Sequence, residues 1–95
     1  MIYPPLPETP TWADLVPGDH IDLARTITPD VRFTWTIHAP IEPVLDVAGL
    51  VVVPFHSSAE PGRLMTMRTR SSQLVVTDFP EYDVAVRPSH DRRSA

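Results

Sequence analysis

The chain has 95 residues, a formal net charge of −4 at pH 7 and 42% hydrophobic residues, values typical of one soluble globular domain. It contains no cysteine and no lysine, and all eight of its basic residues are arginine. This composition excludes disulfides, Cys-type zinc sites, thiolate catalysis and lysine-dependent phosphate loops. The negative charge also disfavours nucleic-acid binding.

Four prolines between positions 4 and 10 predict an extended, proline-rich arm over residues 1–10. Two placements of this arm are open. It can lie along its own domain with Ile2, Tyr3 and Leu6 buried, which is the placement that we expect. Alternatively, its short proline motif can enter the aromatic groove of a partner. The candidate partner-binding residues of the arm are Tyr3, Pro4, Pro5, Leu6 and Pro7.

A single helical turn follows the arm. Thr11 and Asp14 have the spacing of a capping box, in which each side chain satisfies a free backbone N–H group at the start of a helix. Pro17 and Gly18 then form a turn that ends this element. We expect Trp12 to plug one end of the core and Asp19 to act as a turn residue.

Apolar and polar residues alternate over residues 19–27 and 31–39, which predicts two β-strands joined as a hairpin. Directly opposed residues of an antiparallel pair share one face of the sheet. A three-residue loop at 28–30 satisfies this condition and pairs Ile27 with Val31.

The predicted hairpin register places His20 directly opposite His38, with Asp22 beside them on the outer face. Two imidazoles and a carboxylate are ligands that a divalent metal accepts, so His20, Asp22 and His38 form a candidate metal site. The spacing of these residues matches no known ligand signature. We therefore expect an exposed polar pair, no bound metal and no cofactor.

The second half of the chain alternates strands and turns. Residues 40–46 resemble a connecting loop because two prolines cannot sit in a central ladder. We expect Pro54 to end the pairing of a buried central strand, and residues 88–95 to form a disordered polar tail. Met65 and Met67 share one face and suit an adaptable binding surface. The predicted strands cover residues 44–55, 63–69, 73–78 and 82–86.

Five or six short strands with frequent turns predict an all-β domain over residues 11–87, either an SH3-like or a partly open antiparallel β-barrel. A resemblance supports this expectation. It is carried by Trp12, Leu15, the Pro17-Gly18-Asp19 turn, Ile21 and the aromatic strand at 33–37. Residues 11–39 resemble the small SH3-like barrels found in actinobacteriophage and actinobacterial proteins of unknown function. This resemblance implies a phage-type protein with no catalytic residues to carry over.

No nucleophile elbow, glycine-rich phosphate loop or carboxylate pair in an apolar pocket is present, so we do not expect an enzyme. We expect a protein-interaction module that docks to a host or phage protein. One alternative is an oligomeric virion structural protein, such as a head decoration or head–tail connector. Another is a single-stranded nucleic-acid-binding barrel that uses Arg63, Arg68 and Arg70, with Phe33 or Trp35 as stacking platforms. We expect no membrane association, and a location in the host cytoplasm or in the virion.

Overall fold

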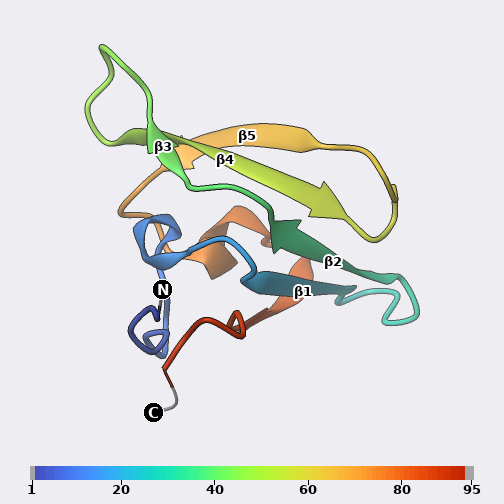
Figure 1. Cartoon of the computed structure of the whole chain (residues 1–95). Coiled ribbons are helices and arrows are strands. Elements are labelled where there is room, and N and C mark those ends of the chain that lie inside the picture. The colour runs from blue at the N-terminus through green and yellow to red at the C-terminus, as the bar shows by residue number, and fades with distance from the viewer. Residues whose placement is uncertain (1, 94–95) are drawn as a thin grey trace.

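The computed structural model describes residues 2–93 and is an all-β fold with six antiparallel strands (Figure 1). The strand order is β3-β4-β2-β1-β6, and β5 pairs with the other edge of β4. Within the described residues no ladder joins β5 to β6, so the sheet is not closed into a complete barrel. The strands are β1 (His20–Arg25), β2 (Arg32–Ile37), β3 (Glu42–Pro43), β4 (Leu50–Ser57), β5 (Met65–Arg70) and β6 (Tyr82–Arg87).

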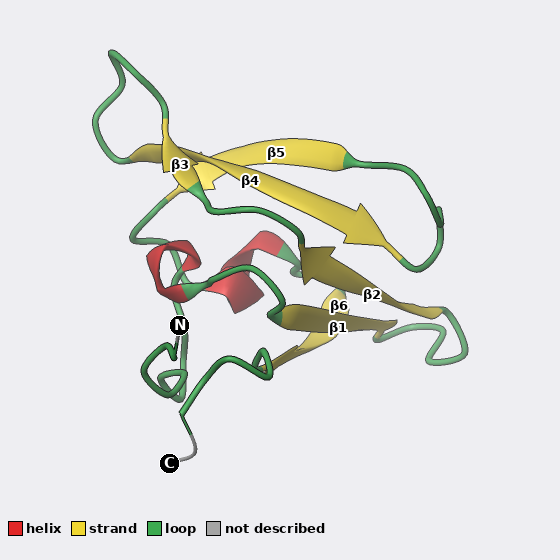
Figure 2. Ribbon diagram, viewed as in Figure 1, coloured by secondary structure: helices red, strands yellow, loops and turns green. Residues whose placement is uncertain are grey.

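Two short 3-10 turns complete the fold: η1 (Trp12–Asp14), and η2 (Val75–Asp78) between β5 and β6. Figure 2 shows both turns between the β4–β5 hairpin and the β1–β6 pair. The prediction of a strand at 73–78 is wrong. Residues 75–78 form a 3-10 turn, in which Thr77 N–H donates to the Leu74 carbonyl and only Val75 is buried. Among the described residues, the only β pairing of the 73–78 segment is a single bridge between Leu74 and Thr11.

The strand containing Pro54 begins at Leu50 and not at residue 44 as predicted, and Pro54 does not end its pairing. β4 continues to Ser57, because Pro54 lies opposite the break between β2 and β3, where the His38 N–H donates to the Pro54 carbonyl at 3.2 Å. A proline lacks the N–H that a complete ladder needs. The short pairing of β3 with β4 also corrects the prediction that residues 40–46 form only a loop.

The β1–β2 hairpin has a five-residue connection at 26–30, so the predicted three-residue loop is wrong. The register pairs Leu23 with Phe33, and the Arg25 N–H donates to the Val31 carbonyl at 3.0 Å. Ile27 is 84% exposed and does not pair with Val31. Thr26 bonds instead to the Glu81 carbonyl at the start of β6. The observed register keeps odd residues opposite odd residues, as predicted, but differs from the predicted register by two residues.

One end of the core is closed around Trp12, which is fully buried. Its indole N–H donates to the Asp78 carboxylate at 2.6 Å, and Thr69 and Gln73 donate to the same carboxylate. This carboxylate therefore joins η1, β5 and η2. The buried apolar residues that pack with Trp12 are Leu15, Ile21, Leu23, Ile37, Val51, Val53, Phe55, Val75 and Phe79.

The segment after β6 is tied to the start of the domain, which corrects the prediction of a disordered tail as far as residue 93; residues 94 and 95 lie outside the described residues. Arg92 is held by Asp19 in an ion pair at 2.7 Å, with side chains that are 3% and 0% exposed. Asp19 also accepts bonds from the backbone N–H groups of Val16 and Ser89. Asp19 is thus a turn residue and also one half of a buried ion pair.

The proline-rich segment contacts the same C-terminal residues. Tyr3 forms a parallel bridge with Arg92, and the Pro4 carbonyl accepts a bond from the Arg92 guanidinium at 2.8 Å. Leu6 is half-buried against the core, whereas Ile2 is 70% exposed. Pro4, Pro5 and Pro7 are exposed. Met1 lies outside the described residues.

Candidate functional site

The outer face of β6, β1, β2 and β4 carries the polar side chains of these strands in cross-strand rows. One row runs from Arg87 through His20 and Thr36 to His56, and the next contains Ala85, Asp22 and Thr34. Ser58 lies next to Thr34 in this row. The Ser58 N–H donates to the Thr34 carbonyl, and the Thr34 N–H donates to the Ser58 hydroxyl.

The three candidate metal ligands do not converge. His20 lies opposite Thr36, with its Nδ1 atom 2.9 Å from the Thr36 hydroxyl, and His38 lies beside His56 with ring centroids 6.2 Å apart. The pairing of His20 with His38 was wrong because it depended on the three-residue loop. In the part of the chain that the structure describes, no group of three His, Cys, Asp or Glu side chains could hold a metal ion.

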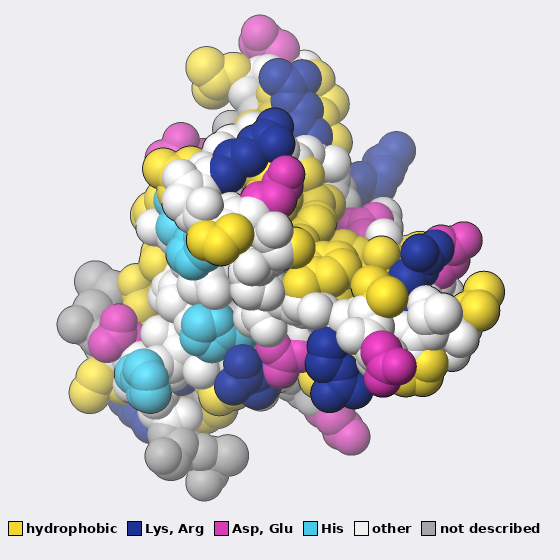
Figure 3. Space-filling view, turned by 90° about the vertical axis from the view of Figure 1, so that its right-hand side faces the viewer, with side chains coloured by type: hydrophobic (Ala, Val, Ile, Leu, Met, Phe, Trp, Pro, Cys, Tyr) yellow, Lys and Arg dark blue, Asp and Glu magenta, His cyan; other side chains and the backbone are white. Residues whose placement is uncertain are grey.

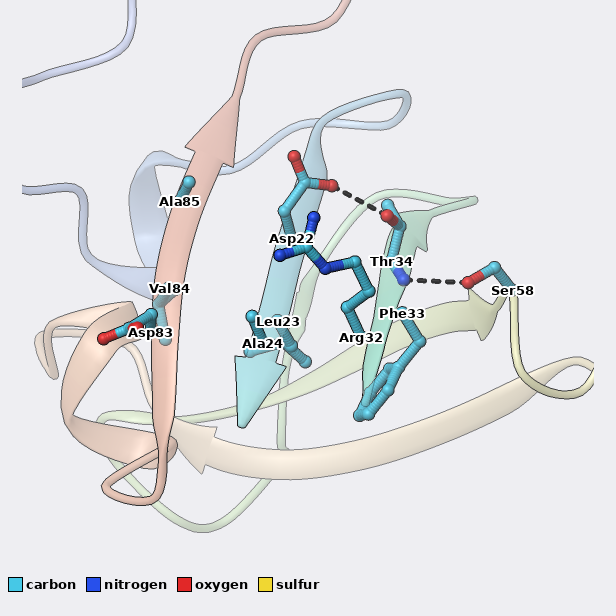
Figure 4. Close-up of a pocket in the computed structure, with 10 residues that line it drawn as sticks. All are labelled: Asp22, Leu23, Ala24, Arg32, Phe33, Thr34, Ser58, Asp83, Val84 and Ala85. Carbon is cyan, nitrogen blue, oxygen red and sulfur yellow. Dashed lines mark hydrogen bonds between the residues drawn. The ribbon is translucent and has the colours of Figure 1, made fainter. Parts of the chain in front are cut away.

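A hollow of about 540 Å³ lies on this outer face (Figure 4). Its floor contains the small side chains of Ala24 and Ala85. Asp22 and Asp83 line it as carboxylates, and Arg32 lines it with a guanidinium whose Nε donates to the Pro29 carbonyl at 3.4 Å. Thr34 and Ser58 line it with hydroxyl groups. The charges around the hollow are mixed, so they do not select one class of charged ligand.

The environment of Asp22 in the hollow shifts the pKa of its carboxyl group. Partial burial raises the pKa of its carboxyl group, but hydrogen bonds from Arg87 and Thr34 and the nearby positive charges outweigh that effect. The net pKa of Asp22 therefore lies below its ordinary value. The Arg87 guanidinium is 2.5 Å from the carboxylate, and Thr34 donates to it at 2.7 Å. Asp22 is thus an ionised partner of Arg87.

The serines near His56 have structural hydrogen bonds. Ser57 is buried on the inner face, and its hydroxyl accepts the Ala59 N–H at 3.1 Å. Ser58 lies on the outer face, and its hydroxyl accepts the Thr34 N–H at 2.8 Å. Among the described residues, neither serine hydroxyl bonds to an imidazole, which is the contact that a Ser–His nucleophile requires.

The end of the sheet opposite Trp12 leaves apolar side chains uncovered. Phe33 and Tyr82 make an edge-to-face pair at 5.7 Å there, and both are half-buried. Met65 is also half-buried, and Leu64 beside it is 69% exposed. Figure 3 looks at this end and shows hydrophobic side chains gathered in a hollow among charged ones. We use the name open end for the half-buried residues Phe33, Met65, Met67 and Tyr82, which pack on the core, together with the exposed residues Val31 and Leu64 near them in sequence.

Two ion pairs flank the open end. Arg63 pairs with Glu60 at 3.1 Å in the β4–β5 loop, and Arg25 pairs with Glu81 at 3.6 Å between β1 and β6. All four side chains are well exposed, so these pairs contribute little to stability. Within each pair the positive and negative charges cancel. The open end therefore has an apolar centre, and the ion pairs beside it carry no net charge.

Two sets of candidate residues that the sequence suggested separately lie on or beside β5. Met65 and Met67 face inward, whereas Arg68 and Arg70 are exposed on the opposite face. Arg63 precedes the strand and is already paired with Glu60. Phe33 and Trp35 point to the inner side of the sheet, where Trp35 stacks on Phe55 at 3.9 Å. The arginines and the aromatic rings therefore lie on different faces and do not combine into one stacking site.

Comparison of the chain with protein-family models, with curated proteins and with solved structures found no match. None of the helical segments within residues 2–93 has the length and apolar character needed to cross a membrane.

Proposed function

We propose that this protein is a non-catalytic protein-interaction module with an SH3-like barrel, and that its partner binds at the open end. The strand order supports this fold, because the last strand pairs with the first and a 3-10 turn connects β5 to β6. A protein-interaction module is also the function that the sequence predicts.

The contrast between the two ends of the sheet carries the proposal. At one end Trp12, Leu15 and Val75 are buried and the terminal segments are tied down. At the other end Phe33, Tyr82 and the two methionines remain half-buried, although aromatic side chains gain most when fully covered. Aromatic and methionine side chains are also the residue types enriched at protein interfaces. A protein partner that covers this end buries apolar surface that the chain itself leaves in water.

Affinity capture from a lysate of the source cells tests the proposal, with bound proteins quantified by mass spectrometry. Leu64→Glu places a charge at the open end, at a side chain that is 69% exposed and tolerates the change without unfolding. Leu45→Glu is the matched control, because Leu45 is 84% exposed in the 44–49 loop. We expect a partner that the wild type and Leu45→Glu capture and that Leu64→Glu loses. Capture of the same proteins in equal amounts by all three forms refutes the proposal.

A further inference from the structure

We infer that β5 is the strand to which the partner adds, and that the partner supplies an extended segment in which acidic and apolar side chains alternate. This inference rests on the proposed function and specifies the chemistry of its partner. It is carried by three features of β5: the direction of its free backbone groups, the charge of its outer face and the apolar character of its inner face.

The free backbone groups follow from the pairing with β4. The Ser71 N–H donates to the Gly49 carbonyl at 2.8 Å, in register with the β4–β5 ladder. Hydrogen-bonded and non-bonded pairs alternate along an antiparallel ladder, so Met67 and Thr69 bond to β4, whereas Thr66 and Arg68 do not. Pro54, which has no N–H to donate, lies opposite Thr66. This agrees with the alternation, because Pro54 and Thr66 form one of the non-bonded pairs. The N–H and C=O groups of Thr66 and Arg68 therefore point away from β4, along the open edge.

The outer face of this edge is basic on an acidic protein. Residues 63–70 include three arginines and no acidic residue, while the whole chain carries a net charge of −4. Arg68 and Arg70 are exposed, and within residues 2–93 neither forms an ion pair. In an added strand, the residue directly opposite Arg68 lies on the same face, where a carboxylate is favourable and a cation is not.

The inner face of the same edge is apolar. Met65 and Met67 are half-buried and belong to the open end. The neighbours of an acidic residue in an extended segment point to the inner face, because side chains alternate along a strand. Apolar residues at these positions cover the methionines, so the strand selects alternation of acidic and apolar residues.

A second copy of this chain does not meet these requirements at β5. In a symmetric antiparallel pairing of two β5 strands, the Arg68 and Arg70 side chains of both copies share one face, where like charges repel. Basic residues on an edge strand are a known protection against such self-pairing. The partner segment is therefore acidic and comes from another protein.

Fluorescence polarisation with synthetic peptides tests the inference on the full-length protein. The probe is a labelled seven-residue peptide of alternating Glu and Val, and the comparison peptide alternates Lys and Val. N-methylation at the Glu positions removes the N–H groups that face Thr66 and Arg68, so it should abolish binding. N-methylation at the Val positions alters N–H groups that face away and should leave the affinity within about threefold.

Charge reversal gives the second arm of the test. We expect Arg68→Glu with Arg70→Glu to weaken binding of the Glu peptide by about tenfold and to favour the Lys peptide. Arg32→Glu is the matched control, since Arg32 is an exposed arginine on the central strand β2. Both variants change exposed side chains, and circular dichroism verifies their folding.

Three results overturn the inference. The first is the absence of binding by the Glu peptide, in which case the arginines only prevent self-pairing. The second is equal affinity for both peptides with no effect of the charge reversal. The third is tighter binding of a single-stranded oligonucleotide that is lost in the Arg68→Glu, Arg70→Glu protein. All three leave the proposed function standing if lysate capture still depends on Leu64, whereas loss of that dependence refutes the proposed function itself.

Discussion

Arg92→Met is the substitution with the largest expected effect outside the apolar core. In the native protein the Asp19 carboxylate is fully buried and accepts four bonds. Two come from the Arg92 guanidinium at 2.7 and 2.9 Å, and two come from backbone N–H groups. Methionine fills a similar volume but leaves the buried carboxylate without its counter-charge. Breaking a buried ion pair in this way costs about 3–5 kcal/mol.

That cost is a large part of the total stability, which is about 5–15 kcal/mol for a natural domain. For a chain of this length each kcal/mol lowers Tm by about 4–8 °C, so we expect a decrease of at least about 12 °C. Thermal unfolding followed by tryptophan fluorescence measures it. Arg93→Met is the control, because the Arg93 side chain is exposed and its backbone N–H bond to Tyr3 is unaffected.

A double variant separates the ion pair from simple loss of packing. Asp19→Asn alone leaves the buried guanidinium uncompensated, whereas Asp19→Asn with Arg92→Met removes both charges. We therefore expect the double variant to be more stable than the sum of the two single effects implies. A Tm for Arg92→Met within about 3 °C of the wild type, or strictly additive effects, contradicts the assignment of a buried ion pair.

Three further predictions concern other contacts. Gly18→Ala should destabilise by about 1–3 kcal/mol in urea titration, because Gly18 has φ +92° and a Cβ there meets the Ser89 hydroxyl at 2.6 Å; Ser89→Gly should recover part of the loss. Since the pKa of Asp22 is lowered on folding, its contribution is present above its unfolded pKa near 4 and disappears as the pH falls through the folded pKa. Arg87→Gln should therefore cost under about 1 kcal/mol at pH 6 and nothing at a pH below the folded pKa, as urea titrations at both pH values would show. Trp12→Phe should cost about 1–3 kcal/mol, because it leaves a buried hydrogen-bond acceptor without its indole donor; unchanged stability would contradict that bond.

The sequence predicted the all-β class and the places of most strands because alternation of apolar and polar residues is a local signal. It also predicted Trp12 as the plug at one end of the core, where the side chain is fully buried. Both features depend on residues that are close in sequence and on which side chains are buried, and both leave a pattern in the amino-acid sequence.

The hairpin register could not be decided in the same way. Parity allows a three-residue or a five-residue loop equally well, and two apolar residues, Ile27 and Val31, favoured the shorter one. The decisive contact is Thr26 with the Glu81 carbonyl, which lies 55 residues away in sequence. The candidate pairing of His20 with His38 depended on the register of the three-residue loop. The structure has a different register, so this pairing does not form.

The tail was mispredicted for a related reason. Residues 88–93 are polar, and polarity normally indicates exposure at a chain end. Arg92 is buried because its guanidinium meets Asp19, Asp14 and Pro4 together. A single arginine shows no pattern that identifies a partner more than 70 residues away. The edge position of β5 likewise depends on the global strand order, so Met67 and Arg68 were noted as separate candidates and not as two faces of one edge strand.

Amide hydrogen exchange along β5, measured by NMR on the free protein, tests the central claim most directly. If β5 is a free edge, the amides of Thr66 and Arg68 exchange rapidly, whereas those of Met67 and Thr69 are protected by β4. Addition of the alternating Glu and Val peptide should then slow exchange at Thr66 and Arg68. Equal protection of all four amides in the free monomer would show that the edge is already covered and would contradict the account.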